Sequence, residues 1–171
     1  KPEATAAAID RDGWFHTGDA GYLKDSHLYL TERIKDLFKT SNGKYISPQA
    51  LETKLAIDRY IDQIAVIADE RKFVSALIVP VYGFVKDYAK EKGIAYSNMD
   101  ELLQHPKIQA LFRARIDTLQ QQFAHYEQVK RFTLLTEPFS MERGELTNTL
   151  KLKRSVVAKN YKGLIDKMYE E

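Results

Sequence analysis

Two apolar runs in the middle of the chain restrict its fold more than any other feature of the sequence. Residues 61–68 read Ile-Asp-Gln-Ile-Ala-Val-Ile-Ala, and residues 73–80 read Phe-Val-Ser-Ala-Leu-Ile-Val-Pro. Both runs have the length of strands and are rich in residues that favour strands. Only the four polar residues 69–72 join them, so the pattern predicts two adjacent antiparallel strands in the core.

Helical patterns lie on both sides of these runs. Ser47 can cap a helix whose first residue is Pro48. A longer helix is expected from Pro106, where apolar residues recur at helical spacing. The stripe consists of Ile108, Leu111, Phe112, Ile116, Leu119 and Phe123. Such a stripe is typical of a core-facing helix and not of a cofactor site.

The remaining patterns complete the prediction of an α+β fold. A hairpin with a turn at residues 25–27 is expected near the start, and one amphipathic helix ending near Tyr169 at the end. Further helices are expected over residues 3–9, 83–92 and 99–105, and a further strand over residues 131–136. We therefore expect a small domain with a short β-hairpin and a mostly antiparallel sheet of roughly three strands, packed by helices and preceded by the tail strands of a larger domain.

Composition excludes several kinds of chemistry. The chain lacks cysteine, which excludes disulfides, thiolate metal sites and a thiol nucleophile. Its 26 basic and 24 acidic residues leave a net charge of +2, too small to indicate nucleic-acid binding. The histidines lack metal-ligand spacing, so no metal is assigned. We expect a cytoplasmic protein, because no apolar run approaches the roughly 18 residues of a membrane span and no signal peptide is recognisable.

Three groups of polar residues could carry chemistry. Asp19 follows the turn Thr17-Gly18, and its carboxylate could accept two hydrogen bonds from a sugar diol. Arg33 offers a planar fork of donors. Lys151 and Lys153 alternate with leucines, so an extended chain would place both lysines on one side. Taken singly, each group also fits a plain turn aspartate or a solvated basic surface.

Together, and in this order, the three groups resemble the C-terminal part of the adenylate-forming enzymes, which include acyl-CoA synthetases, peptide-synthetase adenylation domains and luciferases. Residues 13–19, Gly-Trp-Phe-His-Thr-Gly-Asp, are similar to a segment whose aspartate binds the ribose of ATP or AMP. The resemblance thus implies ribose contacts for Asp19 and for Arg33. Residues 146–154 resemble the lysine motif near the end of the family, which implies that Lys151 is the catalytic lysine.

The segment from Arg33 to Glu52 resembles the hinge and loop of the same family, although Glu32 stands where most members have glycine. The resemblance implies a hinge at Lys35. It also implies that Lys39 and Gly43 lie on the face used in the second half-reaction. Residues 1–34 are then the truncated tail of a large N-terminal adenylation domain, and residues 35–171 are a mobile C-terminal lid.

Within the family, the Leu-Thr-Asn-Thr-Leu-Lys form of the lysine motif, the helix-rich residues 84–126 and the segment 127–132 resemble the long-chain branch. This implies a fragment of a long-chain fatty-acid CoA ligase, inactive alone, whose complete form uses ATP, Mg²⁺ and coenzyme A. The N-terminal domain would hold most of the Mg²⁺ contacts, and the complete enzyme could associate peripherally with membranes. An acyl-carrier-protein ligase and a peptide-synthetase domain stay open as alternatives. A basic module that binds RNA or a protein partner is disfavoured by the small net charge.

Overall fold

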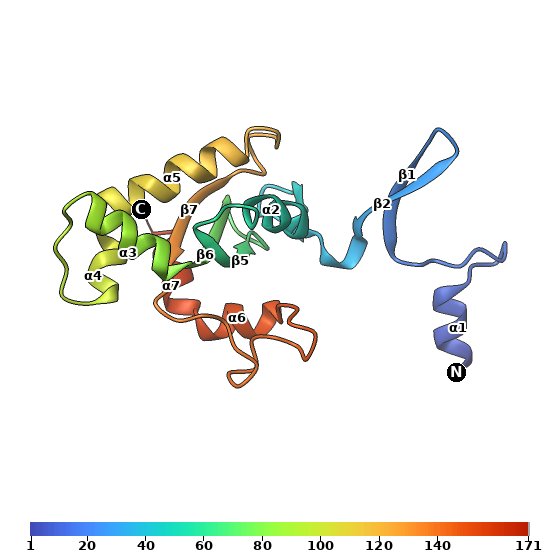
Figure 1. The fold of residues 1–171 in the computed structure, drawn as a ribbon. Coiled ribbons are helices and arrows are strands. Elements are labelled where there is room, and N and C mark those ends of the chain that lie inside the picture. Colours follow the sequence, from blue (N-terminus) through green and yellow to red (C-terminus); the bar gives the residue numbers. More distant parts are fainter. Residues whose placement is uncertain (171) are drawn as a thin grey trace. The chain divides into compact units, whose positions relative to one another are not determined.

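The computed structural model describes residues 1–170, with only the backbone described for Thr31, Glu32 and Lys35. The chain forms two compact units, Lys1–Leu37 and Phe38–Glu171 (Figure 1). The first unit contains helix α1 (Pro2–Ala8), strands β1 (Asp19–Lys24) and β2 (His27–Arg33), and the short 3₁₀ turn η1 (Ile34–Asp36).

The first unit is organised around the antiparallel hairpin of β1 and β2, which confirms the predicted hairpin. Asp25 and Ser26 form its turn, with φ of 50° and 62°. Positive φ at two successive turn residues matches the natural twist of the flanking strands. Beyond the turn, the rings of Tyr22 and Tyr29 stack across the hairpin with their centroids 5.1 Å apart.

The second unit is built on a sheet of three strands in the order β5-β6-β7. These strands are β5 (Ile61–Ile67), β6 (Val74–Pro80) and β7 (Val129–Leu134). Strands β5 and β6 are antiparallel, which confirms the central prediction. Strand β7 begins two residues earlier than expected and runs parallel to β6. The parallel pairing requires a long crossover.

Helices α3 (Tyr82–Glu91), α4 (Met99–Gln104) and α5 (Pro106–Leu119) form this crossover. The second unit also has a two-strand hairpin of β3 (Phe38–Lys39) and β4 (Tyr45–Ile46), followed by α2 (Pro48–Leu55). The α+β prediction is confirmed.

Helices cover both faces of the three-stranded sheet. Ile64 and Ile78 point to one face, which packs against α2, α3, α4 and α5. Ala65 and Leu77 point to the other, which packs against the C-terminal helices. Figure 1 shows α5 and α6 (Arg154–Asn160) on opposite sides of the strands. All seven residues of β6 are buried for this reason, which explains why its sequence is nearly continuous in apolar residues.

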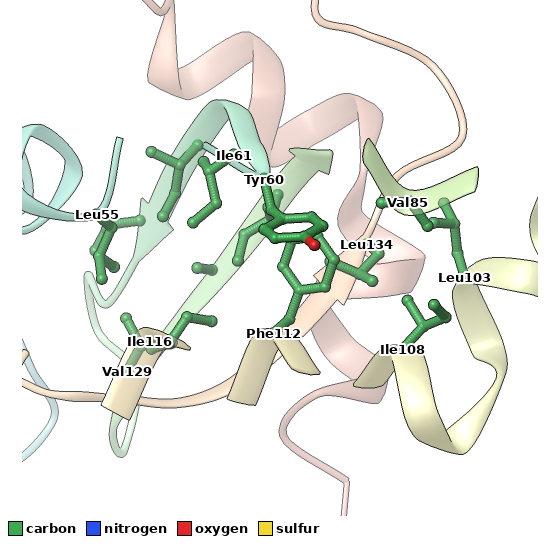
Figure 2. Close-up of a cluster of buried hydrophobic side chains, with 14 of the residues drawn as sticks. Leu55, Tyr60, Ile61, Val85, Leu103, Ile108, Phe112, Ile116, Val129 and Leu134 are labelled. Carbon is green, nitrogen blue, oxygen red and sulfur yellow. The ribbon is translucent and has the colours of Figure 1, made fainter. Parts of the chain in front are cut away.

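The larger core lies between the sheet and α5. Figure 2 shows the ring of Tyr60 close to that of Phe112, with which it makes an edge-to-face contact at 6.1 Å. Ile108, Phe112 and Ile116 are buried, which confirms the stripe as a core face.

The helix start predicted at Ser47 is confirmed, and the structure shows a second capped start at Asn98. The Ser47 hydroxyl accepts a hydrogen bond from the Ala50 N–H at 3.4 Å. Asn98 accepts one from the Glu101 N–H at 2.9 Å, and the Glu101 carboxylate accepts one from the Ser97 N–H at 2.7 Å. Reciprocal bonds of this kind satisfy backbone donors that the first helical turn leaves without partners.

The single final helix that we expected is divided. Helices α6 (Arg154–Asn160) and α7 (Lys162–Lys167) are separated at Tyr161, where φ is −104° and ψ is 17°. Helical hydrogen bonds continue across the break, since the Tyr161 N–H donates to Val157 at 3.0 Å. The Tyr161 ring packs edge-on against Phe139 at 5.7 Å, a tertiary contact that sequence periodicity does not reveal.

Candidate functional site

The two predicted ribose contacts lie opposite each other in the first unit. Asp19 opens β1, Arg33 closes β2, and the strand register pairs them directly. The Arg33 Nε lies 3.2 Å from the Asp19 Oδ1. The guanidinium is largely exposed, whereas the carboxylate is about 29% exposed. A carboxylate acceptor beside guanidinium donors is the arrangement that a sugar diol can satisfy.

A glycine turn orients this pair. Gly18 has φ of +76°, a conformation that residues with a side chain rarely adopt. Its carbonyl accepts a hydrogen bond from the Ile34 N–H at 2.8 Å, beside the end of β2. The Thr17 hydroxyl accepts one from the Asp19 N–H at 3.1 Å. These bonds place Asp19 at the start of its strand.

Lys39 and Gly43 belong to the β3–β4 hairpin of the second unit. Gly43 has φ of +76°, and its N–H donates to the Thr40 carbonyl at 2.8 Å, so it lies in the turn of this hairpin. Lys39 pairs with Tyr45 in the strand register, and its ammonium lies 5.9 Å from the centre of that ring. The Lys39 N–H donates to the Asp69 carboxylate at 3.3 Å, which joins the hairpin to the end of β5.

Lys151 is the last residue of a tight turn that begins at Thr147. Leu146 and Leu152 form an antiparallel bridge, and the Thr147 N–H donates to the Lys151 carbonyl at 2.8 Å. The Thr147 hydroxyl accepts the Lys151 N–H at 3.0 Å. The Lys151 side chain is exposed. We name residues 146–152 the lysine turn.

Sequence reasoning missed the backbone conformation inside the lysine turn. Leu150 has φ of +59°, which is uncommon for a residue with a side chain, and it is 67% exposed. Leucine in the sequence gives no signal for this conformation, which glycine adopts without strain. The expected alternation does hold on either side of Leu152, because Lys151 and Lys153 are both exposed and Leu152 is half-buried.

A buried carboxylate lies next to the lysine turn in the chain, and no pattern in the sequence indicates its burial. The Glu145 side chain is 1% exposed. Its oxygens accept hydrogen bonds from Arg143 at 3.1 Å, Asn160 at 3.1 Å and the Ser140 N–H at 3.0 Å. Burial acts to raise the pKa of Glu145, but these hydrogen bonds outweigh it and hold the pKa below its ordinary value. The Glu145 carbonyl also accepts the Lys153 N–H at 2.8 Å.

Arg154, the last residue of the basic stretch, is engaged in the fold. Its guanidinium makes two hydrogen bonds of 2.6 Å with the Glu52 carboxylate. Glu52 also accepts the Val66 N–H at 2.8 Å, so the pair joins α2, β5 and α6. This geometry makes Arg154 a structural residue and leaves Lys151 and Lys153 as the exposed cations of the stretch.

The predicted hinge, Lys35, has its backbone in η1, and its side chain lies outside the described part of the structure. The predicted domain boundary between residues 34 and 35 stays a prediction. Among the side chains that the structure describes, no group of three or more histidine or acidic residues could hold a metal ion. None of the helices in that range has the length and apolar character needed to cross a bilayer.

Comparison with known proteins places the chain in a family. A profile described as the AMP-binding enzyme C-terminal domain matches residues 35–171. The chain is 35% identical over 173 residues to a peroxisomal long chain acyl-CoA synthetase 7 of Arabidopsis thaliana. It is 36% identical over 176 residues to a long-chain-fatty-acid–CoA ligase 5 of Rattus norvegicus. Each alignment covers 99% of this chain and 25% of the relative.

Among solved structures, the adenylation domain of a carboxylate reductase from Mycobacterium chelonae matches with a TM-score of 0.78 and 26% identity. That match covers 99% of this chain and 25% of the other. The chain therefore belongs to the AMP-binding enzyme C-terminal domain family, and it spans about a quarter of the length of the relatives that it matches.

Proposed function

We propose that this chain is the C-terminal part of an ATP-dependent ligase that joins long-chain fatty acids to coenzyme A. The observation that carries the proposal is the exposed Lys151 on its hydrogen-bonded turn, within a motif of the long-chain type. The likeness to long-chain acyl-CoA synthetases along 99% of the chain supports the same substrate class. The large domain, with most of the pocket, would come from the rest of the enzyme.

The proposed reaction has two steps. In the first, a fatty carboxylate oxygen attacks the α-phosphorus of ATP, and the bond to pyrophosphate breaks to leave acyl-AMP. In the second, the thiol sulfur of coenzyme A attacks the acyl carbon, the thiol proton is lost, and AMP leaves. Mg²⁺ would neutralise phosphate charge and would be held mainly by the large domain, because the described residues offer no ligand cluster.

The residues of this chain have separate roles in the proposal. Asp19 and Arg33 hold the nucleotide ribose, the carboxylate as acceptor and the guanidinium as donor. The first step brings an anionic carboxylate toward an anionic phosphate, and negative charge grows where they meet. A fixed ammonium such as that of Lys151 stabilises the transition state most at that point.

The second step would use a different surface of the lid. We propose that the lid reorients about Lys35, so that the face carrying Lys39 and Gly43 replaces that of Lys151. Hinges of this kind are usually a few residues that absorb backbone rotation. A cytoplasmic location, and peripheral membrane association of the complete enzyme, stay predictions.

A direct assay of the acceptor tests the proposed function. The full-length enzyme, given ATP and a saturated long-chain fatty acid, is expected to form the thioester with coenzyme A. The alternative acceptor is a carrier protein. Mass spectrometry of the products formed with each acceptor distinguishes transfer to coenzyme A from transfer to a carrier protein. Acyl transfer to the carrier protein alone would refute the proposal of a coenzyme A ligase.

Replacing Lys35 with proline tests the hinge. Proline fixes φ near about −65° and restricts the preceding residue as well, so Lys35→Pro should hinder rotation. We expect it to slow thioester formation from supplied acyl-AMP roughly tenfold more than it slows acyl-AMP formation. The control Lys35→Ala removes the side chain but leaves the backbone free to rotate. It should slow each of the two steps much less than Lys35→Pro slows thioester formation. Equal slowing of both steps by Lys35→Pro would exclude a hinge at this position.

A further inference from the structure

Thr147 lies at the start of the lysine turn, and each of its three polar groups is bound inside that turn. Its N–H donates to the Lys151 carbonyl at 2.8 Å, and its carbonyl accepts the Leu150 N–H at 2.9 Å. Its hydroxyl oxygen accepts the Lys151 N–H at 3.0 Å and the Thr149 N–H at 3.3 Å. Both backbone polar groups of Lys151 are therefore bound to this one threonine.

The base of the lysine turn is fixed to the second unit. Leu146 is 8% exposed and belongs to the same buried cluster as Val157 of α6. The antiparallel bridge between Leu146 and Leu152 closes the base. Residues 148–151 are exposed. The turn thus projects from a fixed base, and the hydrogen bonds inside it decide the direction in which Lys151 leaves the backbone.

The ammonium of Lys151 gets no support from its neighbours. Among the side chains that the structure describes, none is bound to it. Arg154 differs in this respect, because the Glu52 carboxylate holds its guanidinium. A lysine carries its charge on a flexible four-carbon stem. The region that the ammonium can reach is consequently set by the backbone of Lys151.

The conformation of Leu150 shows that this backbone has to be held. Its φ of +59° is one that a residue with a side chain disfavours, and it persists only where surrounding contacts impose it. The Leu150 N–H is bound to the Thr147 carbonyl, and the next N–H, that of Lys151, is bound to the Thr147 hydroxyl. Without the hydroxyl, Leu150 could return to negative φ, which would turn Lys151 away from its present direction.

We propose that Thr147 is a positioning residue for Lys151, and that its hydroxyl keeps the lysine in the orientation that the first half-reaction requires. This role rests on the proposed function, in which Lys151 stabilises charge as acyl-AMP forms. A displacement of about 1 Å in a catalytic arrangement can slow a reaction by about 10²-fold. Since the other bonds of the turn would remain, the loss expected without the hydroxyl is smaller, about tenfold.

The replacement Thr147→Val tests this role in the full-length enzyme, because it exchanges the hydroxyl for a methyl group and keeps the branched shape. Isotope exchange between pyrophosphate and ATP should slow about tenfold, and the KM for ATP should change less than about twofold. Thioester formation from supplied acyl-AMP should be unchanged. Thr147→Ser retains the hydroxyl, so its exchange rate should stay within about twofold of the wild type.

Two further comparisons separate positioning from general damage. The matched control is Thr136→Val, which removes the hydroxyl of an exposed threonine outside the lysine turn and should change neither step. The second comparison adds Thr147→Val to Lys151→Ala. A residue that acts only through Lys151 has nothing to position once that lysine is gone, so the double variant should be no slower than Lys151→Ala alone.

Hydrogen exchange measures the positioning without any catalysis. In NMR spectra of this chain, the amide proton of Lys151 should exchange about fivefold faster in Thr147→Val than in the wild type, and Thr147→Ser should restore the slower rate. Circular dichroism reports whether each variant folds. If Thr147→Val does not fold, Thr147→Ala takes its place, because it also lacks the acceptor.

Three results would overturn the role of Thr147: wild-type pyrophosphate exchange in Thr147→Val, an added loss in the double variant, or unchanged amide exchange at Lys151. Failure of the proposed function gives a different pattern. In that case Lys151→Ala itself would leave pyrophosphate exchange undiminished, whereas a failure of the positioning role alone would leave Lys151→Ala slow and Thr147→Val fast.

Discussion

Replacing Lys151 with alanine in the full-length enzyme should slow acyl-AMP formation by about 10²–10³-fold, the loss typical when one preorganised group that stabilises transition-state charge is removed. The lysine turn holds Lys151 through bonds to its backbone, so truncating the exposed side chain should leave the fold intact. The loss should therefore fall on the rate of the first step and not on the amount of folded enzyme.

Isotope exchange between pyrophosphate and ATP measures this step directly. Thioester formation from supplied acyl-AMP should survive in Lys151→Ala, because the proposed second step uses another surface. Lys153→Ala is the matched control, since Lys153 is an exposed lysine two residues away whose N–H is bound to the Glu145 carbonyl in either case. Undiminished exchange in Lys151→Ala, or equal loss in Lys153→Ala, would show that the catalytic lysine is misassigned.

Replacing Glu145 with alanine should lower the free energy of unfolding by about 3 kcal/mol, because it removes one partner of a buried ionic network. The Asn160 amide and the Ser140 N–H lose their acceptor, and the Arg143 guanidinium loses its buried one and keeps the exposed Glu137. Urea unfolding followed by circular dichroism measures the change. Glu137→Ala is a sharp control, because Glu137 pairs with the same Arg143 but is 72% exposed. That change should cost less than about 1 kcal/mol.

The same network predicts a dependence on pH. Because the folded protein lowers the pKa of Glu145, its ionisation stabilises the fold above the ordinary glutamate pKa of about 4.3. This contribution should be lost as the pH falls through the lowered pKa. The stability gap between wild type and Glu145→Gln should accordingly narrow below about pH 4.3. A gap that stays constant down to the acid transition would contradict an ionised Glu145 in the network.

Local patterns made much of the fold predictable. The cap at Ser47 depends on residues close in sequence, and the structure confirms it. The β5–β6 pairing was predictable because only a short turn joins the strands. The parallel pairing of β7 was not predictable, since the crossover pairs residues that are 55 or 56 positions apart and local patterns do not encode its direction.

The candidate site was predictable in part. Its motifs led to Asp19, Arg33 and Lys151, and the structure adds that the first two face each other across a hairpin. The buried hydrogen-bond network of Glu145 could not be predicted. Glu145 is an ordinary charged residue in the sequence, and its partners come from another turn and from α6. The positive φ of Leu150 could not be predicted either, since leucine rarely adopts this conformation.

The direct pairing of Asp19 with Arg33 has a consequence for the order of events in the proposed cycle. Both residues belong to one hairpin, so the strand ladder sets their separation independently of the second unit. A ribose held between them would stay bound while the lid changes its orientation. AMP departure would then be a separate kinetic event from lid motion, and acyl-AMP would be retained during the interval between the two half-reactions.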